Sequence, residues 1–287
     1  MASRDTDVVI GGQDRGTLPG RLVGDTGAVT PSATQLPFLE SRPRLGLEVL
    51  IVLAISLGQS GVYSVLRIIE RMTRGVQLNQ QTSTLNASVT PDRPWLDLSY
   101  QLVGIAFALV PALLVLYLLS LTDRPATRRI GFDLTRPGFD AWFGTVVAAC
   151  IGIPGLGLYL VAKALGVNTQ VQASGLTDHW WTIPVLVLAA AQNAVLEEVV
   201  MIGYLFTRLG QLQWRIPAII LTSAVVRGSY HLYQGWGGFA GNLIMGVVFG
   251  LIYLRWKRVM PLVVAHTLLD VAAFVGYALL APHVSWL

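Results

Sequence analysis

Long apolar runs separated by short polar segments dominate the chain after its first forty or so residues. About 20 helical residues are needed to cross a hydrocarbon core about 30 Å thick, and seven runs are of that order. We therefore predict an all-α fold, a polytopic transmembrane helix bundle of about seven spans, at residues 45–66, 100–122, 140–165, 183–208, 216–233, 239–255 and 259–281.

The composition agrees with a membrane protein. Of the 287 residues, 53% are hydrophobic and only 13% are charged, whereas soluble domains carry roughly 25% charged residues. The net charge of +4 forms no basic stripe with exposed aromatic residues, so we expect no nucleic acid partner. The single cysteine, Cys150, excludes an intrachain disulfide and a cysteine metal site, and we expect it to be a small buried hydrophobe.

Residues 1–44 differ from the rest of the chain. They contain acidic residues, Gly, Pro and Thr but no apolar core of a signal peptide. We predict a disordered cytosolic tail at 1–44, followed by a transmembrane domain at 45–287.

Arginine and lysine are distributed unevenly between the loops. With the N-terminus in the cytoplasm, the cytoplasmic side collects 11 of these residues and the outer side 5, as the positive-inside rule requires. Four of the outer five lie between residues 67 and 99, and a return of this segment to the cytosolic side would change the number of spans. Arginine outnumbers lysine eighteen to two, which favours a GC-rich bacterial genome. We predict a multi-pass protein of the cell membrane with a cytoplasmic N-terminus.

Six ionisable side chains lie well inside the predicted spans. Because such a group is expensive at bilayer depth, we expect all six to face one another or a water-filled cavity rather than lipid. Two pairs have the spacing i, i+4, which places each pair on one helix face. Adjacent glutamates point about 100° apart, so one can face the cavity while the other supports it. The six residues are Glu197, Glu198, Arg227, His231, His266 and Asp270.

These residue types suit hydrolysis of an amide without a serine or cysteine nucleophile. A carboxylate beside a histidine can position and deprotonate a water. A second histidine, His266, can donate to a developing oxyanion, and Asp270 one turn later can orient its ring.

Other functions remain open for the same residues. Glu198, His231 and His266 would also form a zinc set, although the chain has no HExxH motif. The group of six could be a buried packing network. It could also belong to a transporter, since paired acids and arginine are common there, but we find no inverted repeat.

Three motifs in these spans resemble those of a known family. Residues 197–206 resemble the EExxxR motif of the CAAX protease and bacteriocin-processing (Abi) family, residues 227–231 its FxxxH motif, and residues 266–270 its HxxxN/D motif. The order is the same, and the resemblance covers about residues 180–275. It implies an intramembrane endopeptidase that cleaves membrane-associated peptides or proteins with a glutamate-activated water.

The resemblance also implies a role for each residue. Glu197 would be the general base and Glu198 its partner, and His231 would help to hold the water. His266 and Asp270 would line the oxyanion site. The family favours metal-free catalysis, so no cofactor is expected, with zinc as the alternative.

The sequence departs from the family at two positions. Ile202 stands where the family has arginine, and Arg227 stands where the second motif has phenylalanine. We hypothesise that Arg227 supplies the missing cation, and because an unpaired arginine is costly at this depth, we expect a glutamate partner. Alternatively, Arg227 extends outwards to the membrane surface. The lost arginine also favours a non-catalytic scaffold or immunity protein of the same fold.

Overall fold

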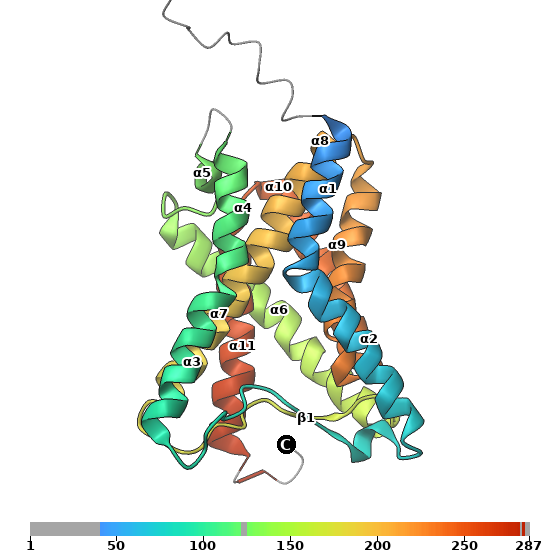
Figure 1. Cartoon of the computed structure of the whole chain (residues 1–287), viewed down its shortest axis with the longest axis vertical. Coiled ribbons are helices and arrows are strands. Elements are labelled where there is room, and N and C mark those ends of the chain that lie inside the picture. The colour runs from blue at the N-terminus through green and yellow to red at the C-terminus, as the bar shows by residue number, and fades with distance from the viewer. Residues whose placement is uncertain (1–40, 122–124, 282, 285–287) are drawn as a thin grey trace, which may run out of the picture. The chain divides into compact units, whose positions relative to one another are not determined.

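About three quarters of the described residues are helical, and only two short strands occur among them (Figure 1). The computed structural model describes residues 41–121, 125–281 and 283–284. The predicted all-α bundle is therefore confirmed. The predicted tail lies outside the described residues except for positions 41–44, where the first helix already begins at Arg42.

Most helices are joined by short connections, but the α2–α3 and α6–α7 connections are longer and carry the two strands. Two three-residue strands, β1 and β2, pair in parallel, with Thr82 opposite Gln170. In order, the elements are α1 Arg42–Ala54, α2 Leu57–Thr73, η2 Leu78–Gln80, β1 Thr82–Thr84, α3 Pro94–Ala108, α4 Val110–Ser120, α5 Ala126–Ile130, α6 Pro137–Ala164, β2 Gln170–Gln172, α7 Thr182–Glu197, η3 Glu198–Tyr204, α8 Leu205–Gln211, α9 Ile216–Tyr230, η4 Leu232–Gln234, α10 Trp236–Trp256 and α11 Met260–Leu280.

The number of membrane-spanning helices is lower than the seven predicted. Among the described residues, five helical segments are long and apolar enough to span a membrane: Pro94–Ser120, Pro137–Ala164, Thr182–Gln211, Trp236–Trp256 and Met260–Leu280. The first predicted span is broken into α1 and α2, which are bent by 54° and would make a sixth span together. The predicted span 216–233 contains α9, which has only 15 residues before the chain turns at His231.

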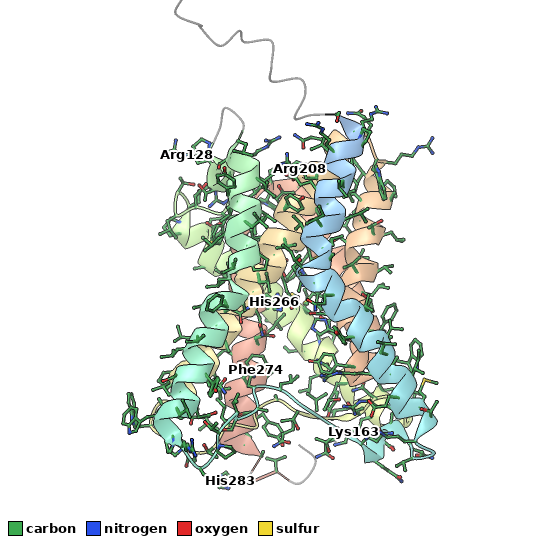
Figure 2. All side chains as sticks on the ribbon, in the orientation of Figure 1. Arg128, Lys163, Arg208, His266, Phe274 and His283 are labelled. Carbon is green, nitrogen blue, oxygen red and sulfur yellow. The ribbon has the colours of Figure 1, made fainter. Side chains whose placement is uncertain are left out.

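The helix ends form two opposite faces, which we name for what they carry. The basic face carries the connections α4–α6, α8–α9 and α10–α11, and Figure 2 shows Arg128 and Arg208 at this end. The strap face carries the connections α2–α3 and α6–α7, including the paired β1 and β2 strands, and lies at the end of Lys163 and His283. Exposed tryptophans occur at both faces, as at membrane interfaces: Trp142, Trp214 and Trp256 at the basic face, Trp95 and Trp180 at the strap face.

Cys150 is exposed on α6, so its predicted burial is wrong. Neighbouring α6 side chains such as Ile153 are exposed as well. In a bilayer an apolar side chain gains nothing by avoiding lipid tails. An apolar sequence context therefore does not indicate which side of a spanning helix is buried.

Two arginines hold helices together near the basic face. Arg208 Nε donates to Glu48 Oε1 at 2.8 Å, and its Nη2 donates to the carbonyl of Leu118 at 3.0 Å, which joins α8 to α1 and α4. Arg258 binds Asp140 through Nε at 2.9 Å and Nη2 at 2.6 Å, which joins the start of α11 to α6. Such two-point contacts fix the relative position of the helices.

Candidate active site

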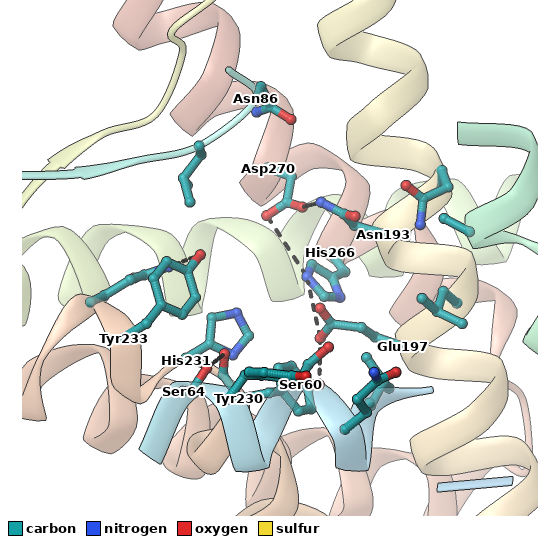
Figure 3. A pocket seen from close by; sticks show the side chains of 18 of the residues that line it. Ser60, Ser64, Asn86, Asn193, Glu197, Tyr230, His231, Tyr233, His266 and Asp270 are labelled. Atoms are coloured by element: carbon teal, nitrogen blue, oxygen red, sulfur yellow. Dashed lines mark hydrogen bonds and ion pairs between the residues drawn. The ribbon is translucent and has the colours of Figure 1, made fainter. Parts of the chain in front are cut away.

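Four of the six predicted residues line one cavity of about 650 Å³ (Figure 3), and the other two contact them from behind its wall. Glu197, His231, His266 and Asp270 line the cavity, whereas Glu198 and Arg227 lie fully buried behind its wall. α2 forms one side of the cavity and α7 and α11 the other, and residues 84–86, at the end of β1, line the part of the cavity that reaches the strap face.

The two glutamates lie where α7 changes from an α-helix to a π-helix. Glu197 is the last residue of α7, and Glu198 is the first residue of the π-helical turn η3, whose seven residues are all buried. Glu197 faces the cavity with 8% of its surface exposed, whereas Glu198 has no exposed surface. The prediction that one glutamate faces the cavity and the other lies behind it is confirmed. π-Helical turns frequently mark functional sites.

Arg227 pairs with the glutamates from α9. Its Nη2 donates to Glu198 Oε1 at 2.7 Å, and its Nη1 lies 3.6 Å from Glu197 Oε2. The side chain is fully buried, so the alternative in which it extends to the membrane surface is wrong. Gly246 on α10 makes room for it, because a Cβ there would lie 2.8 Å from Ala224 Cα and 3.3 Å from Arg227 Cδ.

His266 lies between the carboxylates. Its Nδ1 is 2.7 Å from Glu198 Oε1, and because an ionised carboxylate only accepts hydrogen bonds, Nδ1 carries a proton. Its Nε2 lies 4.0 Å from Glu197 Oε2 and 3.8 Å from Asp270 Oδ1. To donate to a substrate, Nε2 must carry a second proton, whose charge these two carboxylates would balance.

His231 is oriented by its own helix. Its Nδ1 lies 3.1 Å from the carbonyl oxygen of Arg227, which only accepts, so Nδ1 is the donor. In the neutral ring, Nε2 is then an acceptor. A ring with a free acceptor that lines a cavity can hold a water molecule.

Two residues at the site were not predicted. Tyr230 Oη donates to Glu197 Oε2 at 2.6 Å, and Asn193 Nδ2 donates to Asp270 Oδ2 at 3.3 Å. Asn193 precedes Glu197 by four residues, so the same helical spacing that paired the other groups could have found it. Tyr230 gave no signal, since an aromatic residue beside a histidine in an apolar helix is ordinary.

Three side chains of the cluster could together hold a metal ion. Glu197, Glu198 and His266 offer ligand atoms within 4.8 Å of one another, and His231, which was in the predicted zinc set, is not in this group. Glu198 Oε1 already accepts from Arg227 and lies against His266 Nδ1. A divalent cation there would lie beside the guanidinium and be repelled by it. A metal ion in this position would therefore compete with Arg227 and His266 for Glu198 Oε1.

Comparison with known proteins finds a family match for a segment in the C-terminal half of the chain. Residues 179–272 match the model of the Rce1-like family, which is described as type II CAAX prenyl endopeptidase Rce1-like. This range contains all six predicted residues and confirms the resemblance inferred from the three motifs. No curated protein and no solved structure matches the chain.

Proposed function

We propose that this protein is an intramembrane endopeptidase in which Glu197 activates a water molecule for attack on a peptide bond. The apolar helices and the family match indicate a multi-pass membrane protein of the CAAX-protease type, with a membrane-associated peptide or protein as substrate. The proposal of a glutamate base rests on one observation. Glu197 faces the cavity while one of its oxygens, Oε2, is held by Tyr230.

The proposed reaction begins with a water between Glu197 and His231. Tyr230 holds Oε2, and Oε1 has no hydrogen bond to any described residue, so Oε1 is available to accept the proton of the water. The resulting hydroxide attacks the substrate carbonyl carbon, and the protonated Glu197 then donates its proton to the leaving amine as the C–N bond breaks.

The developing oxyanion needs a hydrogen-bond donor near Glu197. His266 Nε2 lies within 4.0 Å of both Glu197 and Asp270, whose charges would stabilise a doubly protonated ring. Such a ring would donate a hydrogen bond from Nε2 to the oxyanion. Asp270 is held in turn by Asn193. These contacts support the roles that the family resemblance implied for His266 and Asp270.

Arg227 and Glu198 orient this arrangement from behind. Arg227 supplies a fixed positive charge against Glu198, in place of the arginine that the EExxxR motif would have at Ile202. Glu198 in turn holds His266 through Nδ1. We propose that no metal is required, because Arg227 already provides the cation between the glutamates.

Cleavage of membrane-anchored peptides by the purified protein tests the proposal. A panel with and without attached lipid chains is incubated with wild type and with Glu197→Gln, which keeps the shape of the side chain. Loss of a general base lowers the rate by about 10²- to 10⁴-fold. The matched control is Glu48→Gln, since Glu48 also pairs with an arginine and a tyrosine but does not line the cavity.

Two results would count against the proposal. Cleavage that survives Glu197→Gln in a folded sample would exclude Glu197 as the base. A folded wild-type protein that cleaves none of the peptides would instead favour a non-catalytic scaffold or immunity protein.

A further inference from the structure

We propose that the active-site cavity opens on the extracytoplasmic side of the membrane, so that the substrate is a peptide segment presented from outside the cell. The side of the membrane on which the cavity opens follows from the fold and from the distribution of arginine and lysine between its two faces. The statement about the substrate rests on the proposed peptidase function as well.

The cavity reaches one face of the bundle and not the other. Its lining includes residues 84–86 beside β1 and Tyr233 and Gln234 of η4, which meets the α6–α7 connection at the strap face. Figure 1 shows β1 crossing below the space between α2 and α11. Among the described residues, none of those that line the cavity comes from the α4–α6, α8–α9 or α10–α11 connections of the basic face.

Fully buried apolar side chains lie between the site and the basic face on two of the helices. From Val199 to Ile202 every side chain has 0% exposure, as have Leu262 and Ala265 on α11. His266 is eight residues, or about 12 Å of helix, from Arg258 at the basic face. A peptide that approached from the basic face would have to pass these side chains.

The distribution of basic residues orients the two faces. The described part of the basic face and its helix ends carries ten arginines and lysines, and the strap face carries five. Cytoplasmic loops carry the excess of these residues, so the basic face lies in the cytoplasm and the strap face outside. The ten are Arg42, Arg44, Arg128, Arg129, Arg136, Arg208, Arg215, Arg255, Lys257 and Arg258, and the five are Arg67, Arg71, Arg74, Arg93 and Lys163.

The segment that made the orientation uncertain from the sequence stays at the strap face. Residues 67–73 belong to α2 and Arg74 caps its end, where it pairs with Glu70. Arg71 donates to the carbonyl of Thr82 in β1 at 3.1 Å. These contacts hold the end of α2 against the strap, so the segment does not return to the basic face.

Cysteine labelling in intact cells tests the orientation. In a Cys150→Ser background, which removes the one native cysteine, a cysteine is introduced at one of two exposed sites. Val89→Cys lies in the α2–α3 connection, where Val89 is 57% exposed, and Leu134→Cys lies between α5 and α6, where Leu134 is 77% exposed. Neither residue lines the cavity, so peptidase activity is not a condition of the measurement.

A membrane-impermeant maleimide is applied to intact cells and again after permeabilisation. We expect the Val89→Cys protein to be labelled to the same extent in intact and in permeabilised cells. The Leu134→Cys protein should be labelled at least about 10-fold more after permeabilisation. The reverse pattern would place the cavity in the cytoplasm and overturn the proposal, as would labelling of both sites in intact cells. Neither of these results would bear on whether Glu197 is a catalytic base.

Discussion

Two buried arginines of the bundle bind carboxylates in different ways. At the basic face, Arg258 donates from Nε and Nη2 to Asp140 and from Nη1 to Thr135, so each guanidinium nitrogen has a partner. At the site, Arg227 donates only from Nη2 to Glu198. Its Nε and Nη1, and Glu198 Oε2, have no hydrogen-bond partner among the described residues.

The difference separates a structural contact from a functional one. A fully satisfied polar network fixes the positions of the elements that carry it. Asp133 illustrates this, because hydrogen bonding by Thr135, with the Arg258 ion pair, lowers its pKa from the ordinary value. A buried polar group without a partner is unfavourable and calls for another explanation, such as a catalytic role. Under the proposed function, the network of Arg227 serves the chemistry of the site rather than stability.

Removal of each arginine should give the largest contrast. Arg227→Leu leaves Glu198 buried without its cation, which is expected to destabilise the fold by about 3–5 kcal/mol and to abolish cleavage. Arg258→Leu likewise leaves the buried Asp140 without its cation and is expected to cost a similar amount of stability, but with cleavage retained, because neither residue lines the cavity. Thermal unfolding in detergent and peptide cleavage measure both effects. Full activity in Arg227→Leu would rule out the proposed compensation for the arginine missing at Ile202.

A matched pair of tyrosines gives a smaller contrast. Tyr230 Oη donates to Glu197 at 2.6 Å, and Tyr204 Oη donates to Glu48 at 2.9 Å. A hydrogen bond to a charged group contributes about 1.5–3 kcal/mol, so Tyr230→Phe should lower kcat by about 10- to 100-fold.

Tyr204→Phe loses the same kind of bond away from the cavity. It should lower the melting temperature with kcat unchanged. If the two variants lowered kcat equally, the bond from Tyr230 would have no special role in positioning Glu197.

Metal removal should have the smallest effect. Because Arg227 lies against Glu198 where a cation would bind, incubation with a chelator should leave the cleavage rate of wild type unchanged. The measurement is the cleavage rate before and after dialysis against chelator, with and without added zinc. Activity lost with the chelator and restored by zinc would make the site a zinc site.

The sequence predicted the fold class from hydropathy alone, but not the number of spans. A run of apolar residues shows that a segment can enter the membrane, and it does not show where the helix breaks. The break between α1 and α2 at residues 55–56 and the early end of α9 at Tyr230 are set by packing between helices. The buried side of α6, and with it the exposure of Cys150, depends on tertiary contacts for the same reason.

At the site, membrane depth and helical spacing identified the residues but not their pairing. An ionisable group in an apolar helix needs a partner, which brought all six groups to one place. Spacing alone did not reveal that Arg227 binds Glu198 more closely than Glu197, because Arg227 comes from a different helix, whose packing against the glutamates the spacing does not fix. Tyr230 was missed because its hydrogen bond comes from a different helix than Glu197.

The central claim is that the buried pair of Glu198 and Arg227 is retained for catalysis and not for stability. The double variant Glu198→Leu/Arg227→Leu tests it most directly, because replacing both members of a buried ion pair by apolar residues is often neutral or stabilising. We predict that the double variant unfolds at or above the temperature of Arg227→Leu, close to wild type, and cleaves no peptide. A double variant that is stable and still cleaves peptides at the wild-type rate would contradict the account.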